Sequence, residues 1–169
     1  MSTTTQPRTI DDVVELLKDQ HTQLKELMPQ VIETTGKKRT EAFNMVCYML
    51  AVHEALEQAI VHPHATSDAG EEQVSERVKE ELEASEAITE MESMDIDSKK
   101  FHDTYAEFML DVLEHAEHEE HEEFEKIEHD FSADELAKVA KAVEMIENPP
   151  AEMPVFEELL EQVKAELAA

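Results

Sequence analysis

The sequence has 169 residues, which suits one domain with a sizeable core, and its composition (2 Gly, 6 Pro, no Trp and many Ala, Leu, Glu and Lys) favours an all-α fold. The 42 acidic and 14 basic residues give a formal net charge of −28, so we expect neither nucleic acid nor an anionic membrane as a partner. The apolar residues keep a helical period over long windows, which argues against a disordered acidic chain.

The single cysteine and the polar N-terminal residues indicate the expected cellular location. Cys47 alone cannot form an internal disulfide, and its apolar surroundings predict a packed, inert thiol. Residues 1–8 lack the apolar core of a signal peptide, and no apolar run approaches the length of a membrane span. We therefore expect a cytoplasmic protein.

Four long helices are predicted up to about residue 130, each identified by a stripe of apolar residues. Thr9 and Asp12 form a capping box that opens the first helix, and Pro63 is expected to end the second. The predicted helices cover residues 10–33, 41–61, 72–94 and 99–129, joined by loops at 34–40 and 62–71 and a turn at 95–98. Short connections favour antiparallel neighbours, so residues 9–130 are predicted to form an up-down-up-down four-helix bundle.

Two further amphipathic helices are predicted in residues 131–169. Ser132 and Glu135 form a capping box for the first of them, which should end near Glu147 because two prolines follow Asn148. The last helix is expected at about residues 155–167. This extension carries no catalytic pattern, and we expect it to pack outside the bundle or to form the surface for a second copy or another protein.

A pair of His-x-x-x-Glu motifs is the main functional signal: His53 with Glu57 in the second helix, and His115 with Glu119 in the fourth. Residues four apart lie on one face of a helix, so each pair can point at one place. Both pairs interrupt an apolar stripe, and a buried carboxylate is costly unless it is paired or binds a metal. Two such interruptions predict a shared metal site.

The predicted topology places further polar residues at the same depth. His21 lies about a dozen residues before the first connection and His53 about a dozen after it, which corresponds to similar distances along the axis at about 1.5 Å per residue. Glu81 and His115 occupy comparable positions around the connection between the third and fourth helices. We therefore expect polar residues from all four helices to meet in one layer.

Other histidines and glutamates offer competing patterns. His118-Glu122 and His121-Glu125 also match His-x-x-x-Glu, but only His115 and Glu119 continue the apolar register of their helix. Glu122 remains a candidate supporting group. No role is predicted for the histidines at helix ends and in loops, namely His62, His64, His102 and His129. A ferritin-like di-iron site is disfavoured, because none of the 9 His residues follows a Glu at the Glu-x-x-His spacing.

Together these motifs resemble the hemerythrin-like, HHE cation-binding family over roughly residues 9–130. Its pattern is a His on the first helix, His-x-x-x-Glu on the second, a His on the third and His-x-x-x-Glu on the fourth. The third helix here has no His, and Glu81 occupies that register position, with Ser85 one turn later. We interpret Glu81 as a replacement ligand; the alternative is a solvated Glu in an acid-rich helix. The candidate ligands are His21, His53, Glu57, Glu81, His115 and Glu119.

The resemblance implies two iron ions per chain, with carboxylate bridges and an oxo bridge as an open alternative. In this assignment His21 and His53 bind one iron, His115 and Glu81 bind the other, and Glu57 and Glu119 bridge them. Oxygen-rich ligands stabilise ferric iron, so we expect binding of, or reaction with, peroxide, nitric oxide or O2, in a redox or sensing role, and leave enzymatic turnover open. Two alternatives remain: an oxygen-binding or iron-storage protein without turnover, and a metal-free structural or partner-binding bundle.

Overall fold

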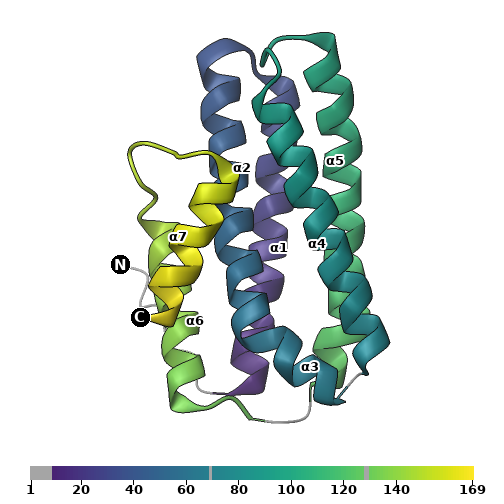
Figure 1. The fold of residues 1–169 in the computed structure, drawn as a ribbon, viewed down its shortest axis with the longest axis vertical. Helices are drawn as coiled ribbons and strands as arrows, with labels where there is room; N and C mark the ends of the chain where they lie inside the picture. Colours follow the sequence, from purple (N-terminus) through teal and green to yellow (C-terminus); the bar gives the residue numbers. More distant parts are fainter. Residues whose placement is uncertain (1–8, 69, 128–129) are drawn as a thin grey trace.

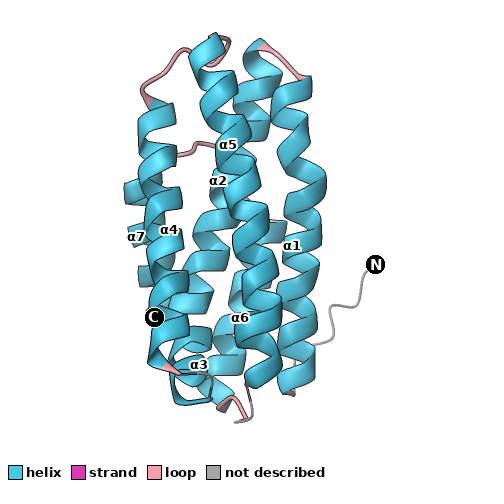
Figure 2. Ribbon diagram, turned by 90° about the vertical axis from the view of Figure 1, so that its right-hand side faces the viewer, coloured by secondary structure: helices cyan, strands magenta, loops and turns pink. Residues whose placement is uncertain are grey.

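The computed structural model describes residues 9–68, 70–127 and 130–169, and this part of the chain is made of helices and short connections, with no strand (Figures 1 and 2). The all-α prediction is therefore confirmed. The α-helices are α1 (Ile10–Glu33), α2 (Gly36–Leu56), α3 (His62–Asp68), α4 (Glu71–Glu92), α5 (Lys99–His118), α6 (Ala133–Glu147) and α7 (Phe156–Ala168). Two π-helical segments, η1 (Glu57–Val61) and η2 (Glu119–Glu123), and a 3-10 turn, η3 (Phe124–Lys126), complete them.

Helices α1, α2, α4 and α5 run side by side along the long axis of the molecule (Figure 1). The connections from α1 to α2 and from α4 to α5 lie at one end, and α3 lies at the other. Apolar residues fill the first end, where the rings of Phe43, Phe101 and Tyr105 pack together. The buried Tyr105 hydroxyl donates a hydrogen bond to the carbonyl of Met28 (2.8 Å). The polar layer therefore lies further along the same helices.

Local capping signals set the helix starts that the sequence predicts well. The Thr9 hydroxyl accepts the N–H of Asp12, and the Asp12 carboxylate accepts the N–H of Thr9. Ser132 and Glu135 make the same reciprocal pair at α6. Both predicted capping boxes are thus confirmed, because each depends only on residues three apart.

Helix α2 begins at Gly36, so the predicted loop at 34–40 is wrong. Gly36 has a positive φ of 58°, and its N–H donates a hydrogen bond to the carboxylate of Asp97, in the connection between α4 and α5 (2.9 Å). The buried Arg39 guanidinium then donates to backbone carbonyls of both connections, those of Ile32, Thr34 and Ile96. Contacts with residues about 60 positions away set this boundary, and the local sequence does not contain them.

The predicted loop at 62–71 is also wrong, because the chain continues from α2 through η1 into α3. The N–H of His62 bonds to the carbonyl of Glu57, the five-residue pattern of a π-helix. Pro63 falls in the first turn of α3, where its missing N–H is tolerated, so it does not end the helix.

The predicted fourth helix divides into α5, η2 and η3, and the chain becomes extended at Ile127. Its predicted end at His129 lies outside the described residues, as do residues 1–8. In α4, Val78 is 43% exposed. Glu81, one turn later, is only 2% exposed.

Helices α6 and α7 pack on α2, and α7 also contacts α4 (Figure 1). The Tyr48 hydroxyl donates to the carbonyl of Met145 in α6, and the N–H of Phe156 in α7 bonds to the Glu92 carboxylate (3.0 Å). As a result every residue from 46 to 57 is buried. No helix in the described part of the chain combines the length and the apolar character that crossing a membrane requires.

Candidate metal centre

The two π-helical segments mark the site. η1 begins at Glu57 and η2 begins at Glu119, so each His-x-x-x-Glu motif ends where its α-helix widens into a π turn. π turns are rare and occur frequently at functional sites. Both carboxylates are fully buried.

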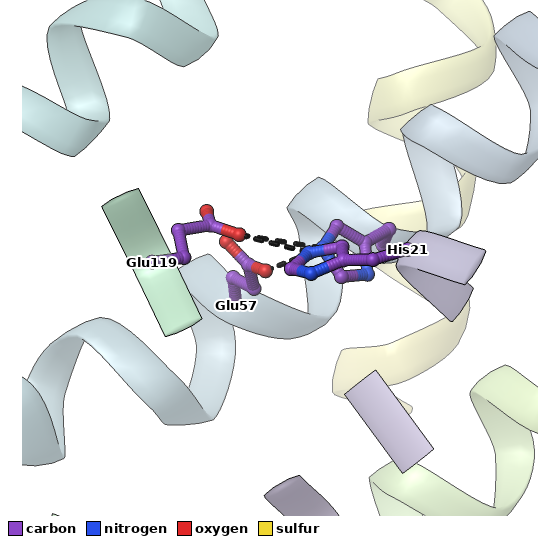
Figure 3. Close-up of side chains that lie close together, drawn as sticks. His21, Glu57 and Glu119 are labelled. Atoms are coloured by element: carbon purple, nitrogen blue, oxygen red, sulfur yellow. Dashed lines mark hydrogen bonds and ion pairs between the residues drawn. The ribbon is translucent and has the colours of Figure 1, made fainter. Parts of the chain in front are cut away.

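One group of possible ligands comes from α1, α2, η1 and η2. His21, His53, Glu57 and Glu119 are all buried, and each offers one nitrogen or oxygen within 4.8 Å of the others. His53 Nε2 lies 2.5 Å from Glu57 Oε1, and His21 Nε2 lies 3.1 Å from Glu119 Oε2. Figure 3 shows His21, Glu57 and Glu119 pointing toward one another.

A second group adds residues of α4 and α5. Glu57, Glu81, His115 and Glu119 also offer atoms within 4.8 Å of one another. His115 Nε2 lies 2.5 Å from Glu119 Oε1 and 3.8 Å from Glu81 Oε1. The structure thus brings all six candidate ligands together, and Glu57 and Glu119 belong to both groups. Each group could hold a metal ion, and the two groups share two carboxylates.

The three histidines of these groups are oriented in the same way. The outer nitrogen, Nδ1, donates to the Glu120 carboxylate from His21 (3.0 Å), to the Gln20 amide oxygen from His53 (2.6 Å) and to the Glu80 carboxylate from His115 (2.6 Å). The inner nitrogen, Nε2, faces the buried glutamates. Metal-binding histidines commonly donate their other N–H to such an acceptor, which fixes the ring and the tautomer.

The Nε2 nitrogens and the carboxylate oxygens at the centre are all potential acceptors, so they fit together only if protons or cations lie among them. Nε2 of His21 lies 2.9 Å from Nε2 of His53, and two neutral imidazoles whose outer nitrogens donate would set acceptor against acceptor there. Glu57 and Glu119 bring two fully buried carboxylates to the same place. Protons or metal cations would remove this conflict, and imidazole with carboxylate suits iron, manganese or zinc. The residues present therefore fit a metal centre.

Comparison with known proteins agrees with this donor set. The sequence profile of the Hemerythrin HHE cation binding domain matches residues 12–127. The chain belongs to the hemerythrin HHE cation-binding domain family. A crystal structure of an HHE cation binding domain-containing protein from Mycobacterium kansasii is similar in fold, with a TM-score of 0.62 and 16% identity over 90% of this chain and 87% of that one. No curated protein gives a significant match.

In this HHE domain the residues of the two motifs shift one another's pKa values. Burial opposes the imidazolium of His53, but the neighbouring Glu57 carboxylate raises its pKa to about 10. Burial likewise opposes the imidazolium of His115, and Glu119 raises its pKa to about 12. Although burial also opposes ionisation of Glu119, His115 holds the pKa of that carboxyl well below its usual range. Protons and a metal cation therefore compete for the same Nε2 atoms.

An arginine supports the His115 side of the HHE domain. Arg77 is buried in α4 and donates to the carboxylates of Glu80 (2.9 Å) and Glu122 (2.6 Å). Glu80 in turn accepts from His115, so Arg77 fixes the carboxylate that orients this imidazole. Glu122, a candidate supporting group in the sequence, thus acts through Arg77 instead of facing the centre.

The competing histidines lie elsewhere, with one exception. His121 and Glu125 are exposed, as the register predicts, and His118 lies at the edge, near Glu80. His64 pairs with Glu135, His102 is exposed, and His129 lies outside the described residues. The exception is His62, which is buried beside the centre although no role was predicted for it. Its spacing of five residues from Glu57 fits a π turn and escapes a search at α-helical spacing.

A cavity of about 250 Å³ reaches the second ligand group from between α2, α4 and α5. Its apolar walls include Leu50, Phe108 and Val112, and His53, Glu81 and His115 line it as well. Glu54 also lines the cavity and is buried there. Burial and the nearby Glu81 raise the pKa of the Glu54 carboxyl to about 8.

Proposed function

We propose that this HHE domain is a non-haem di-iron protein that binds or reacts with small oxidants (peroxide, nitric oxide or O2) in a redox or sensing role. The observation that carries the proposal is the pair of ligand groups sharing Glu57 and Glu119. In this arrangement His21 and His53 would hold one iron, His115 and Glu81 the other, and Glu57 and Glu119 would bridge the two. The bound irons would supply the one-electron chemistry that such oxidants require.

The cavity supports a small, uncharged reactant. Its volume of about 250 Å³ lies below the roughly 300–1,000 Å³ of sites that bind larger ligands, and Leu50, Phe108 and Val112 give it apolar walls. Glu80, Glu83, Asp111 and Glu114 also line it, and this negative charge disfavours anions. O2, nitric oxide and hydrogen peroxide meet both conditions.

The ligand types support reaction over oxygen carriage. The centre offers a carboxylate, Glu81, where the family pattern has an imidazole, and oxygen ligands stabilise the higher oxidation state of iron. Hydrogen bonds hold one side of the centre in place, because Arg77 donates to Glu80 and Glu80 accepts from His115. The irons would therefore bind in a site with little freedom to rearrange.

The test begins with the iron content and optical spectrum of purified protein reconstituted with Fe²⁺. Two irons per chain with charge-transfer absorption in the near ultraviolet is the expected result, whereas a protein that takes up no iron would be a metal-free bundle. Exposed His102→Ala is the matched control for His53→Ala, which should lose iron. Stopped-flow mixing with peroxide and nitric oxide then separates catalytic consumption from reversible oxygen uptake without consumption.

A further inference from the structure

We propose that His62 is a ligand of the iron held by His115 and Glu81, and that it supplies the imidazole missing from the third long helix. The inference rests on the proposed di-iron function and adds one residue to its site. The six ligands predicted from the sequence do not include it.

The position of His62 Nε2 carries the argument. This atom lies 2.6 Å from Glu81 Oε1 and 3.9 Å from Glu57 Oε2, so it faces two carboxylates of the second ligand group. His115 Nε2 approaches the same Glu81 Oε1 at 3.8 Å. Imidazoles from α3 and α5 therefore converge on one oxygen of α4, in the region where the second iron would bind.

The outer side of His62 repeats the arrangement of the other three histidines. Its Nδ1 donates to the carboxylate of Glu123 (3.1 Å), which is fully buried in η2. Four imidazoles in this chain therefore share one geometry, with an outer N–H held by an acceptor and an inner nitrogen turned toward buried glutamates. A histidine that only filled space would not need the same orientation as three candidate ligands.

The π turn explains how a residue after the second-helix motif reaches the centre. A five-residue hydrogen bond joins the N–H of His62 to the carbonyl of Glu57, so His62 lies one widened turn beyond that glutamate. His53, Glu57 and His62 are thus all directed at the centre from one continuous helical segment. Pro63 follows at once and restricts the backbone there.

A rival reading makes His62 an imidazolium that only holds Glu81 in place. His62→Gln separates the two readings, because a glutamine amide can still donate to Glu81 but offers no imidazole nitrogen to a metal. We expect His62→Gln to bind the second Co²⁺ or Fe²⁺ at least about tenfold more weakly than the wild type, and to keep the first. His64→Ala, on the same helix but paired with Glu135, should bind both metals normally.

The affinities are measured by titration with Co²⁺, following its visible absorption, with circular dichroism to check folding. Two equivalents bound by His62→Gln with wild-type affinity would overturn the proposal. If the wild-type protein binds no metal, the proposed function fails. If the wild type and His62→Gln both bind two metals equally well, the proposed function stands and only this inference fails.

A measurement on the wild-type protein tests the proposal without depending on whether the variant folds. In the Co²⁺-loaded protein, each coordinated histidine whose outer nitrogen keeps its proton gives a strongly shifted, exchangeable N–H signal in the proton NMR spectrum. We expect four such signals, for His21, His53, His62 and His115. Three signals would show that His62 is not a ligand.

Discussion

Glu57 is fully buried, and its Oε1 lies 2.5 Å from Nε2 of His53. Burial, and then the nearby Glu119, raise the pKa of its carboxyl well above the usual range. Because burial opposes its ionisation, the pair with His53 adds little net stability to the metal-free fold. Its position is better explained by a bridging role between two cations.

Glu57→Gln should therefore separate stability from metal binding. The amide keeps the shape of the side chain but removes its charge, so we expect metal-free protein to melt at the wild-type temperature or above it. Binding of two metals should weaken at least about tenfold. Glu86→Gln, on the exposed face of α4, is the control and should change neither property. Normal binding of two metals by Glu57→Gln would rule out the bridging assignment.

Metal uptake should release protons at pH 7. The pKa values of His53 and His115 are raised to about 10 and about 12, so both imidazoles carry a proton that a metal must displace. Calorimetric titration in buffers of different ionisation enthalpy should give heats that depend on the buffer. Heats that are the same in all buffers would contradict this competition.

The same pKa shifts predict how the metal-free fold responds to pH. Because the pKa of each histidine is higher in the folded than in the unfolded chain, their contribution to stability is complete below about pH 6.5, the unfolded value. It is lost as pH rises through about 10 to 12. We expect the melting temperature of metal-free protein to fall between pH 7 and pH 10, and that of His53→Gln to fall less over the same range. Equal slopes for both proteins would contradict the assignment.

At the scale of elements, the two connections at one end of the bundle are held together by Arg39. Its guanidinium is the donor for carbonyls at the end of α1 and in the connection before α5. Removing it would leave partly buried carbonyls without this donor, which is costly.

Arg39→Ala should lower the free energy of unfolding by about 3 kcal/mol. The neighbouring Lys38 is exposed, so Lys38→Ala should stay within about 0.5 kcal/mol of the wild type. Urea unfolding of metal-free protein measures both values. Equal stability of the two variants would show that water replaces the guanidinium.

The sequence could predict the elements whose causes are local. Thr9 and Ser132 mark helix starts through partners three residues away, and the apolar register of α5 selects His115 from three overlapping pairs. It could not predict the start of α2, because Asp97 and Arg39 determine it through the fold. The role of His62 was missed for a different reason: a π turn shifts the helical register by one residue, and no local sequence pattern predicts that turn.

At the scale of the whole molecule, α6 and α7 close the side of α2 that the rest of the bundle leaves uncovered. The predicted division at residue 130 therefore separates segments that share one core. Phe156, Leu159, Val163 and Leu167 of α7 are all buried. Sequence signals could identify both helices as amphipathic but could not choose between α2 and another protein as their partner.

Ending the chain at residue 147 tests whether the bundle needs α7 as a cover. The truncation removes α7 and exposes apolar residues of α2, so we expect self-association and a lower melting temperature than for the full chain. Light scattering coupled to gel filtration, with thermal unfolding, measures both. A monomer with unchanged melting temperature would mean that the bundle does not need this cover.

The two π turns also set the residue spacing at the centre. A π turn contains one residue more than the α turn it replaces, so deleting a single exposed residue such as Ala59 would let the helix continue in ordinary form. Because the turn shortens by the same one residue, the helix after the deletion would keep its face toward the centre. His62 would then follow Glu57 at four residues, the same spacing that separates Glu57 from His53. In this chain the arithmetic of residue spacing matters as much as which residues are present.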